Sequence, residues 1–185
     1  MTYAYTPYYC EENVFHLCSD PTLPASTRAA IVVSNALRRV AVAHQRAAPN
    51  ADAPIIWDYH VLLAAWSVEG WAIWDLDTTL GLPVPLDLYL RASFAYPEGF
   101  APPFDARFRV IPAAQYRSTL CSDRSHMREA SGRYRAPPPH WPPIGTGTNL
   151  DRFIDMDDDF VGEVVGLAEL PAALARLEPS EPTPQ

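Results

Sequence analysis

Two otherwise apolar segments each carry a pair of ionisable residues whose spacing could support catalysis. The first segment holds Asp58 and His60, and the second ends with Asp75 and Asp77. Side chains alternate along a strand, so the members of each pair are expected to share one face. A histidine oriented by a carboxylate is the base that nucleophilic catalysis requires. The sequence therefore predicts a general base with its carboxylate partner in apolar surroundings.

The two segments, residues 55–66 and 71–78, are predicted to be the strands of one hairpin. The connection between them is short and contains a glycine, which favours a tight turn between antiparallel strands. A two-residue turn at the centre of this connection places His60 opposite Asp77, and a turn one residue earlier places it opposite Asp75. Both registers stay open at this point, and each brings the histidine to a carboxylate.

Cys10 is the candidate nucleophile among three cysteines. It precedes Glu11 and Glu12 at the start of a predicted helix, where the positive end of the helix dipole lowers the pKa of a thiol and favours the thiolate. A single cysteine more commonly serves as a small buried apolar residue, and the residues alone favour that role for Cys10. Cys18 and Cys121 lack this context. An odd number of cysteines without metal-type spacing favours a reducing compartment, so we expect the protein in the cytoplasm or the nucleus.

Two alternatives compete with His60 as the centre of the chemistry. His126 lies beside Asp123 in a polar loop and is a rival for the base. Asp75 and Asp77 could instead form an acid pair, although neighbours on one strand face more commonly serve one histidine or cap a turn. We expect the polar loop that contains His126 to form a wall of the substrate cleft.

The elements that must position these residues alternate between helices and strands. Their order predicts an α+β fold: a single domain with a mainly antiparallel sheet flanked by helices. We expect the catalytic domain to cover residues 1–177 and residues 178–185 to form a disordered tail. The predicted helices are a short one that begins near Cys10 and those at residues 86–95, 113–120 and 167–177, and the further strands are at residues 30–35, 40–45, 107–111 and 160–165.

Composition and charge place the chain among acidic globular proteins. It has 185 residues, a net charge of −8 and an apolar share of 48%, which suits one domain with a substantial core. Nucleic acid is not an expected partner, because phosphate binding needs a basic surface that 14 dispersed Lys and Arg residues do not supply. No segment reads as a membrane span or a secretory signal. We expect a monomer with no membrane partner, no cofactor and no metal.

The order of a cysteine on a helix, a histidine on a strand and an aspartate on the next strand resembles papain-like and transglutaminase-like thiol enzymes. With its flanking residues, the chain resembles the protein N-terminal glutamine amidohydrolase family over residues 8 to about 170. Two blocks are specific to it, Trp57-Asp58-Tyr59-His60 and Ser122-Asp123-Arg124-Ser125-His126-Met127. The other matching stretches are Tyr9-Cys10-Glu11-Glu12-Asn13, Val33-Ser34-Asn35, Asp75-Leu76-Asp77-Thr78, Phe108-Arg109-Val110-Ile111, Pro137-Pro138-Pro139 and Phe153-Ile154-Asp155-Met156-Asp157.

This resemblance implies a papain/transglutaminase-like core in which Cys10, His60 and Asp75 are the catalytic residues. It implies that the chain deamidates the N-terminal glutamine of proteins or peptides to glutamate, with ammonia release through a cysteine thioester. It also implies a place in the N-degron pathway. Among the two hairpin carboxylates, the resemblance favours Asp75 as the partner of His60 and leaves Asp77 another role.

Recognition of a free α-amine requires an acceptor near the amino end of the substrate. The candidates are Glu11, Asp77 and Asp123, and the sequence does not rank them. Two other functions stay open: acyl transfer to an amine, as in transglutaminases, and peptide binding without catalysis through the proline-rich loop.

Overall fold

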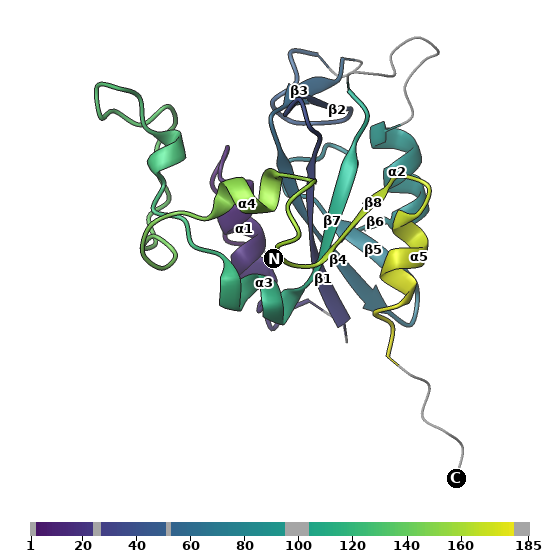
Figure 1. Cartoon of the computed structure of the whole chain (residues 1–185). Helices are drawn as coiled ribbons and strands as arrows, with labels where there is room; N and C mark the ends of the chain where they lie inside the picture. Colours follow the sequence, from purple (N-terminus) through teal and green to yellow (C-terminus); the bar gives the residue numbers. More distant parts are fainter. Residues whose placement is uncertain (1–2, 24–26, 51–52, 95–103, 180–185) are drawn as a thin grey trace.

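A six-stranded antiparallel sheet forms the centre of the protein (Figure 1). The computed structural model describes residues 3–23, 27–50, 53–94 and 104–179. In spatial order the strands of the sheet are β6 (Val84–Pro85), β5 (Gly70–Trp74), β4 (His60–Ser67), β1 (Thr27–Ser34), β7 (Arg107–Pro112) and β8 (Glu163–Gly166). Two further strands, β2 (Val40–Val42) and β3 (Ile55–Trp57), pair with each other.

Helices cover both faces of the sheet, as Figure 1 shows. On one face lie α1 (Cys10–Leu17), α3 (Ala113–Thr119) and α4 (Leu150–Ile154), and on the other lie α2 (Leu86–Phe94) and α5 (Leu170–Ala175). A single turn of 3₁₀-helix, η1 (Ser125–Met127), interrupts the polar loop. The predicted single domain with an antiparallel sheet and flanking helices is therefore confirmed.

The central strands are buried on both faces. Val32 and Leu63 pack with α1, α3 and α4, whereas their neighbours Ile31 and Leu62 pack with α2 and α5. A strand covered on both sides carries apolar residues at every position rather than at alternate ones. This explains why the sequence of β1 and β4 reads as an unbroken apolar run.

The hairpin is present, but both of its strands are shorter than predicted. Ser67 pairs with Gly70, so the two-residue turn lies at the centre of the connection, and the φ of 100° at Gly70 favours glycine there. The predicted first strand is divided, because β3 leaves the sheet to pair with β2. The predicted second strand ends at Trp74, so Asp75 follows the strand instead of belonging to it.

Other boundaries differ by a few residues from the predictions. The strand predicted at residues 40–45 ends at Val42, and the helix predicted at residues 167–177 is α5 alone. Glu178, the first residue of the predicted tail, accepts a hydrogen bond from Trp71 Nε1 at 3.1 Å, while residues 180–185 lie outside the described residues. None of the helices in the described ranges has the length and apolar character that a membrane crossing requires.

One buried arginine on β7 fixes the segment that follows α4. Arg109 is 1% exposed, and its guanidinium donates hydrogen bonds to four main-chain carbonyl groups. The acceptors are the carbonyls of Phe153, Asp155, Asp158 and Val161, at 2.6–3.1 Å. Only a guanidinium has a planar set of donors that can reach so many acceptors at once.

Replacement of Arg109 by lysine is expected to lower the free energy of unfolding by about 2–4 kcal/mol, because buried carbonyls lose their donors. Urea denaturation followed by circular dichroism measures this change. Arg91→Lys is the matched control, since Arg91 forms an exposed ion pair with Asp87 on α2. Equal denaturation midpoints for the two variants contradict the prediction.

Candidate active site

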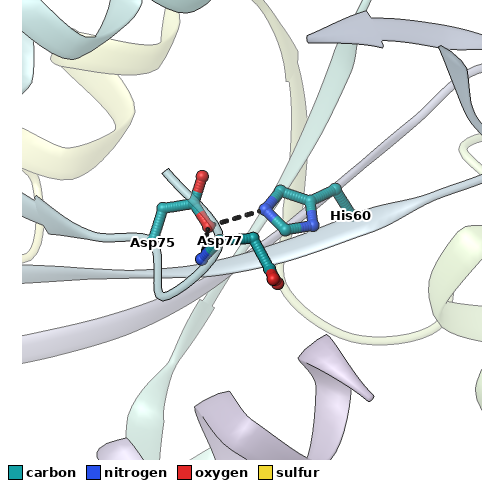
Figure 2. Close-up of side chains that lie close together, drawn as sticks. All are labelled: His60, Asp75 and Asp77. Atoms are coloured by element: carbon teal, nitrogen blue, oxygen red, sulfur yellow. Dashed lines mark hydrogen bonds and ion pairs between the residues drawn. The ribbon is translucent and has the colours of Figure 1, made fainter. Parts of the chain in front are cut away.

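A buried histidine and a buried aspartate form the centre of the site (Figure 2). His60 is the first residue of β4, and Asp75 follows the last residue of β5. His60 Nε2 lies 2.9 Å from Asp75 Oδ1. The turn at the centre of the hairpin connection would place Asp77 opposite His60, but the ladder between β4 and β5 stops at the pair of Leu63 and Trp74. The chain then turns, and the contact goes to Asp75.

The Asp75 carboxylate is saturated with donors. Oδ2 accepts hydrogen bonds from Gln45 Nε2 at 2.8 Å and from the Tyr89 hydroxyl at 2.7 Å. Oδ1 accepts one from the main-chain N–H of Asp77 at 3.0 Å, in addition to its contact with His60. These donors hold the carboxylate in one orientation toward the imidazole.

Burial and charge act in opposite directions on the two partners. Burial raises the pKa of Asp75, but His60 and the hydrogen bonds from Gln45 and Tyr89 outweigh it, so the pKa lies below its ordinary value. Burial lowers the pKa of His60, and the charge and hydrogen bond of Asp75 reverse this, so that it lies well above its ordinary value. The pair is therefore built to stabilise an imidazolium beside a carboxylate.

Cys10 is the first residue of α1 and faces the same cavity as His60. The predicted lowering of its pKa is wrong. Burial raises the pKa of Cys10 to about 11, because the thiol is only 8% exposed and a thiolate loses hydration there. The hydrogen bond and charge of His60 lower the pKa, while the charges of Glu11 and Asp77 raise it. The resting nucleophile candidate is thus a thiol.

A cavity of about 650 Å³ lies beside these residues. Its walls come from the start of α1, from the segment between β3 and β4, and from the loops around η1 and α4. Among the cavity-lining residues are Tyr8, Cys10, Trp57, Asp58, His60, Asp77, Ser125, His126, Met127, Arg135, Leu150, Asp151 and Ile154. The Trp57 ring stacks on the His60 imidazole with a centroid separation of 5.8 Å and an interplanar angle of 13°.

The three candidates for an amine acceptor lie in different places. Asp77 lines the cavity, is 7% exposed, and accepts a hydrogen bond from the Tyr5 hydroxyl at 2.6 Å. Glu11 is buried behind the wall, where it accepts a hydrogen bond from the Tyr59 hydroxyl at 3.1 Å. Asp123 accepts a hydrogen bond from the main-chain N–H of Ser125 at 2.9 Å and stabilises that turn. Of the three, Asp77 is the cavity-lining residue.

Comparison with known proteins connects this geometry to a family. The family model for N-terminal glutamine amidase matches residues 5–174. The chain belongs to this family. It is 42% identical over 163 residues to the protein N-terminal glutamine amidohydrolase of Bos taurus. The aligned region covers 84% of this chain and 78% of that protein. The protein of the same name from Homo sapiens is 41% identical over 161 residues, covering 83% and 78%. That of Arabidopsis thaliana is 34% identical over 167 residues, covering 83% and 76%.

In this member of the amidase family, the polar residues after Cys10 are buried and hold the walls of the cavity. Glu11 lies 3.4 Å from His126 Nε2, so the rival histidine is paired with a carboxylate of α1 and not with Asp123. Burial lowers the pKa of His126, and the nearby carboxylate of Glu11 raises it above its ordinary value. His126 and Ser125 line the cavity, as expected for a wall of the cleft.

Glu12 and Arg124 form a buried ion pair between α1 and the polar loop. Arg124 Nε and Nη2 lie 2.8 Å from the two carboxylate oxygens of Glu12. The remaining guanidinium donors bind the carbonyls of Pro139 and Trp141, at 3.2 and 2.7 Å, and Trp141 Nε1 binds Glu12 at 2.7 Å. The proline-rich stretch is therefore fastened to the helix that carries Cys10.

Several residues of the site were missed by the sequence prediction. Gln45, Tyr89 and Tyr5 bind the carboxylates from positions 14–72 residues away in the chain. Polar residues of these types are common in loops and on helices, so no local pattern singles them out. The block Cys10-Glu11-Glu12-Asn13 did indicate buried polar residues near Cys10. Three polar residues in a row on a short helix cannot all face solvent when the helix packs against an apolar core.

His60, Asp75 and Asp77 offer ligand atoms within 4.8 Å of one another, which is close enough for a metal ion. Asp75, however, already accepts hydrogen bonds from Gln45, Tyr89 and the Asp77 N–H in addition to its contact with His60. A carboxylate whose lone pairs are used in this way is a poor metal ligand. The arrangement is better suited to orienting an imidazole than to coordinating a cation.

We expect iodoacetamide to alkylate Cys10 slowly at pH 8, at a rate that keeps rising to about pH 10. A pKa of about 11 leaves about one thiol in a thousand ionised at pH 8, whereas an ordinary thiol with a pKa of about 8.5 approaches full ionisation by pH 10. Mass spectrometry of a digest measures the rate, with the partly exposed Cys121 as internal control. A rate that levels off below pH 8 contradicts this prediction.

Proposed function

We propose that the chain hydrolyses the side-chain amide of an N-terminal glutamine, releasing ammonia and leaving glutamate. The observation that carries the proposal is the buried contact of His60 with Asp75 beside a cavity that Cys10 also lines. Relatives that share 34–42% of their residues with the chain are named for this activity. We propose Cys10 as nucleophile, His60 as base and Asp75 as the residue that orients His60.

The contacts support a papain-like or transglutaminase-like assignment of roles. Asp75 engages His60 Nε2, which leaves Nδ1 for the thiol and the leaving group. His60 in its neutral form accepts the proton of Cys10, and Sγ attacks the amide carbon. The imidazolium then protonates the amide nitrogen, ammonia leaves and a thioester forms. Neutral His60 takes a proton from water, the hydroxide attacks the thioester, and glutamate leaves as the thiol is restored.

The start of α1 is suited to stabilise the oxyanion of both steps. The first N–H groups of a helix have no acceptor within the helix, so those of Cys10 and Glu11 are the donors nearest the nucleophile. The positive end of the helix dipole adds to their effect on a developing negative charge.

Asp77 is proposed as the acceptor for the α-ammonium group of the substrate. One of its oxygens lies within 4.8 Å of a ring nitrogen of His60. In an extended glutamine, the α-nitrogen lies ~5 Å from the carbon of the side-chain amide. An ammonium bound by Asp77 therefore leaves the amide carbon of glutamine within reach of the catalytic pair. An asparagine, which is one methylene shorter, reaches less far.

Ammonium binding is also proposed to activate the thiol. The charge of Asp77 is one of the factors that raise the pKa of Cys10. A positive charge placed on Asp77 cancels this effect and favours loss of the thiol proton. Recognition of the amino group and activation of the nucleophile would then be one event. A glutamine inside a chain has no free α-ammonium, so it would neither bind Asp77 nor activate Cys10.

Replacement of Cys10 by serine is expected to lower ammonia release from a Gln-initiated peptide by at least about a thousandfold, because the nucleophile is lost. An ammonia assay, together with the gain of about 1 Da in the peptide mass, measures the reaction. Cys121→Ser is the matched control, and it should keep the activity of the unaltered protein.

Peptides that begin with Asn, or that carry an acetylated amino end, should stay unchanged. Incorporation of an added amine would instead support acyl transfer, and binding without any mass change would support a peptide-binding module. If Cys10→Ser releases ammonia as fast as the unaltered protein, Cys10 is not the nucleophile.

Replacement of Asp77 by asparagine is expected to lower kcat/KM for the Gln-initiated peptide about 10- to 100-fold, because a charge-assisted hydrogen bond to the ammonium is lost. The same change should speed alkylation of Cys10 at pH 8, since a charge that raises the pKa of Cys10 is removed. Asp151→Asn is the control, because this carboxylate lines the same cavity but pairs with Arg38. Slower alkylation in Asp77→Asn contradicts the proposed coupling.

A further inference from the structure

The hydrogen bond between Tyr5 and Asp77 connects the segment before α1 to the turn that follows β5. The Tyr5 hydroxyl donates to Asp77 Oδ1 at 2.6 Å, and the two residues are 72 positions apart in the sequence. Asp77 lines the cavity with Cys10 and His60. A short hydrogen bond to one oxygen of a carboxylate restricts its rotation, so the orientation of Asp77 in the cavity depends on Tyr5.

The catalytic helix in turn determines where Tyr5 lies. The Asn13 side chain on α1 donates to the carbonyl of Thr6 and accepts from the N–H of Thr6, both at 2.9 Å. Asn13 is 1% exposed, and this double contact leaves the neighbouring Thr6 main chain little freedom. Tyr5 also packs against the core on the α1 face of the sheet. The same helix therefore carries Cys10 and holds the residue that orients Asp77.

We propose that Tyr5 is a positioning residue for the substrate amino group: it holds one oxygen of Asp77 and so directs the other to accept the α-ammonium. The inference rests on the proposed function, since it concerns the binding of a free amine. It adds a determinant of specificity from a segment outside the catalytic residues, and Asn13 acts on it only through Thr6.

The charges around Asp77 give this contact a second effect. Burial raises the pKa of Asp77, while His60, the hydrogen bond from Tyr5 and the more distant Arg46 lower it, and Asp75 raises it. Without the Tyr5 hydroxyl, the carboxyl group keeps its proton to a higher pH. A protonated Asp77 carries no charge for the ammonium, so substrate binding should weaken first on the acid side.

The test compares Tyr5→Phe with Tyr3→Phe on a Gln-initiated peptide, with kcat and KM measured from about pH 5 to pH 9. Tyr3 lies in the same segment and packs against the same core, which makes it the matched control. We expect Tyr5→Phe to raise KM about 2- to 10-fold with little change in kcat. The acid limb of kcat/KM should move to higher pH, and Tyr3→Phe should leave both unchanged.

Three outcomes overturn the inference. If Tyr5→Phe behaves like Tyr3→Phe while the unaltered protein releases ammonia, Tyr5 has no role in recognition and the proposed function stands. If kcat falls with KM and the acid limb unchanged, Tyr5 serves the structure alone. If the unaltered protein releases no ammonia from the peptide, the proposed function and this inference fail together. Thermal unfolding of each variant establishes that the compared proteins are folded.

Discussion

The buried ion pair between Glu12 and Arg124 is the interaction on which the shape of the cavity depends. It joins α1, which carries Cys10, to the loop around η1 that forms the opposite wall. Each removal of a single partner leaves an uncompensated charge in the interior, at a cost of about 3–5 kcal/mol. Two parallel hydrogen bonds fix the orientation of the guanidinium relative to the carboxylate, so the pair holds the loop in one orientation against α1.

This pair also accounts for an unusual backbone conformation. Arg124 has a φ of 65°, in the left-handed region that residues with a side chain rarely adopt. The conformation turns the chain into η1, which carries His126 and Met127 to the cavity. The ion pair with Glu12 and the hydrogen bonds to the Pro139 and Trp141 carbonyls hold the arginine there. Strain at this residue is thus compensated by buried contacts that also attach the proline-rich stretch.

The sequence allowed the fold class and the hairpin to be predicted, because these depend on local patterns, although not which of two turns joins the strands of the hairpin. Apolar runs and a glycine near the turn are visible without any knowledge of distant contacts. The partners of Asp75 could not be found in this way, since Gln45 and Tyr89 reach it from other elements. The pKa of Cys10 was predicted in the wrong direction, because the helix position is local information and burial is not.

The early end of β5 links the fold to the chemistry. With regular pairing beyond Trp74, Asp77 would lie directly opposite His60, and Asp75 would lie on the same face opposite Leu62. The turn after Trp74 instead brings both carboxylates to one histidine, and the Asp77 N–H contributes to holding Asp75. Their environments then separate them: four contacts keep Asp75 ionised and fixed on the imidazole, whereas burial raises the pKa of Asp77, which lines the cavity. Two aspartates that the strand pattern could not distinguish are thus made different by where one strand stops.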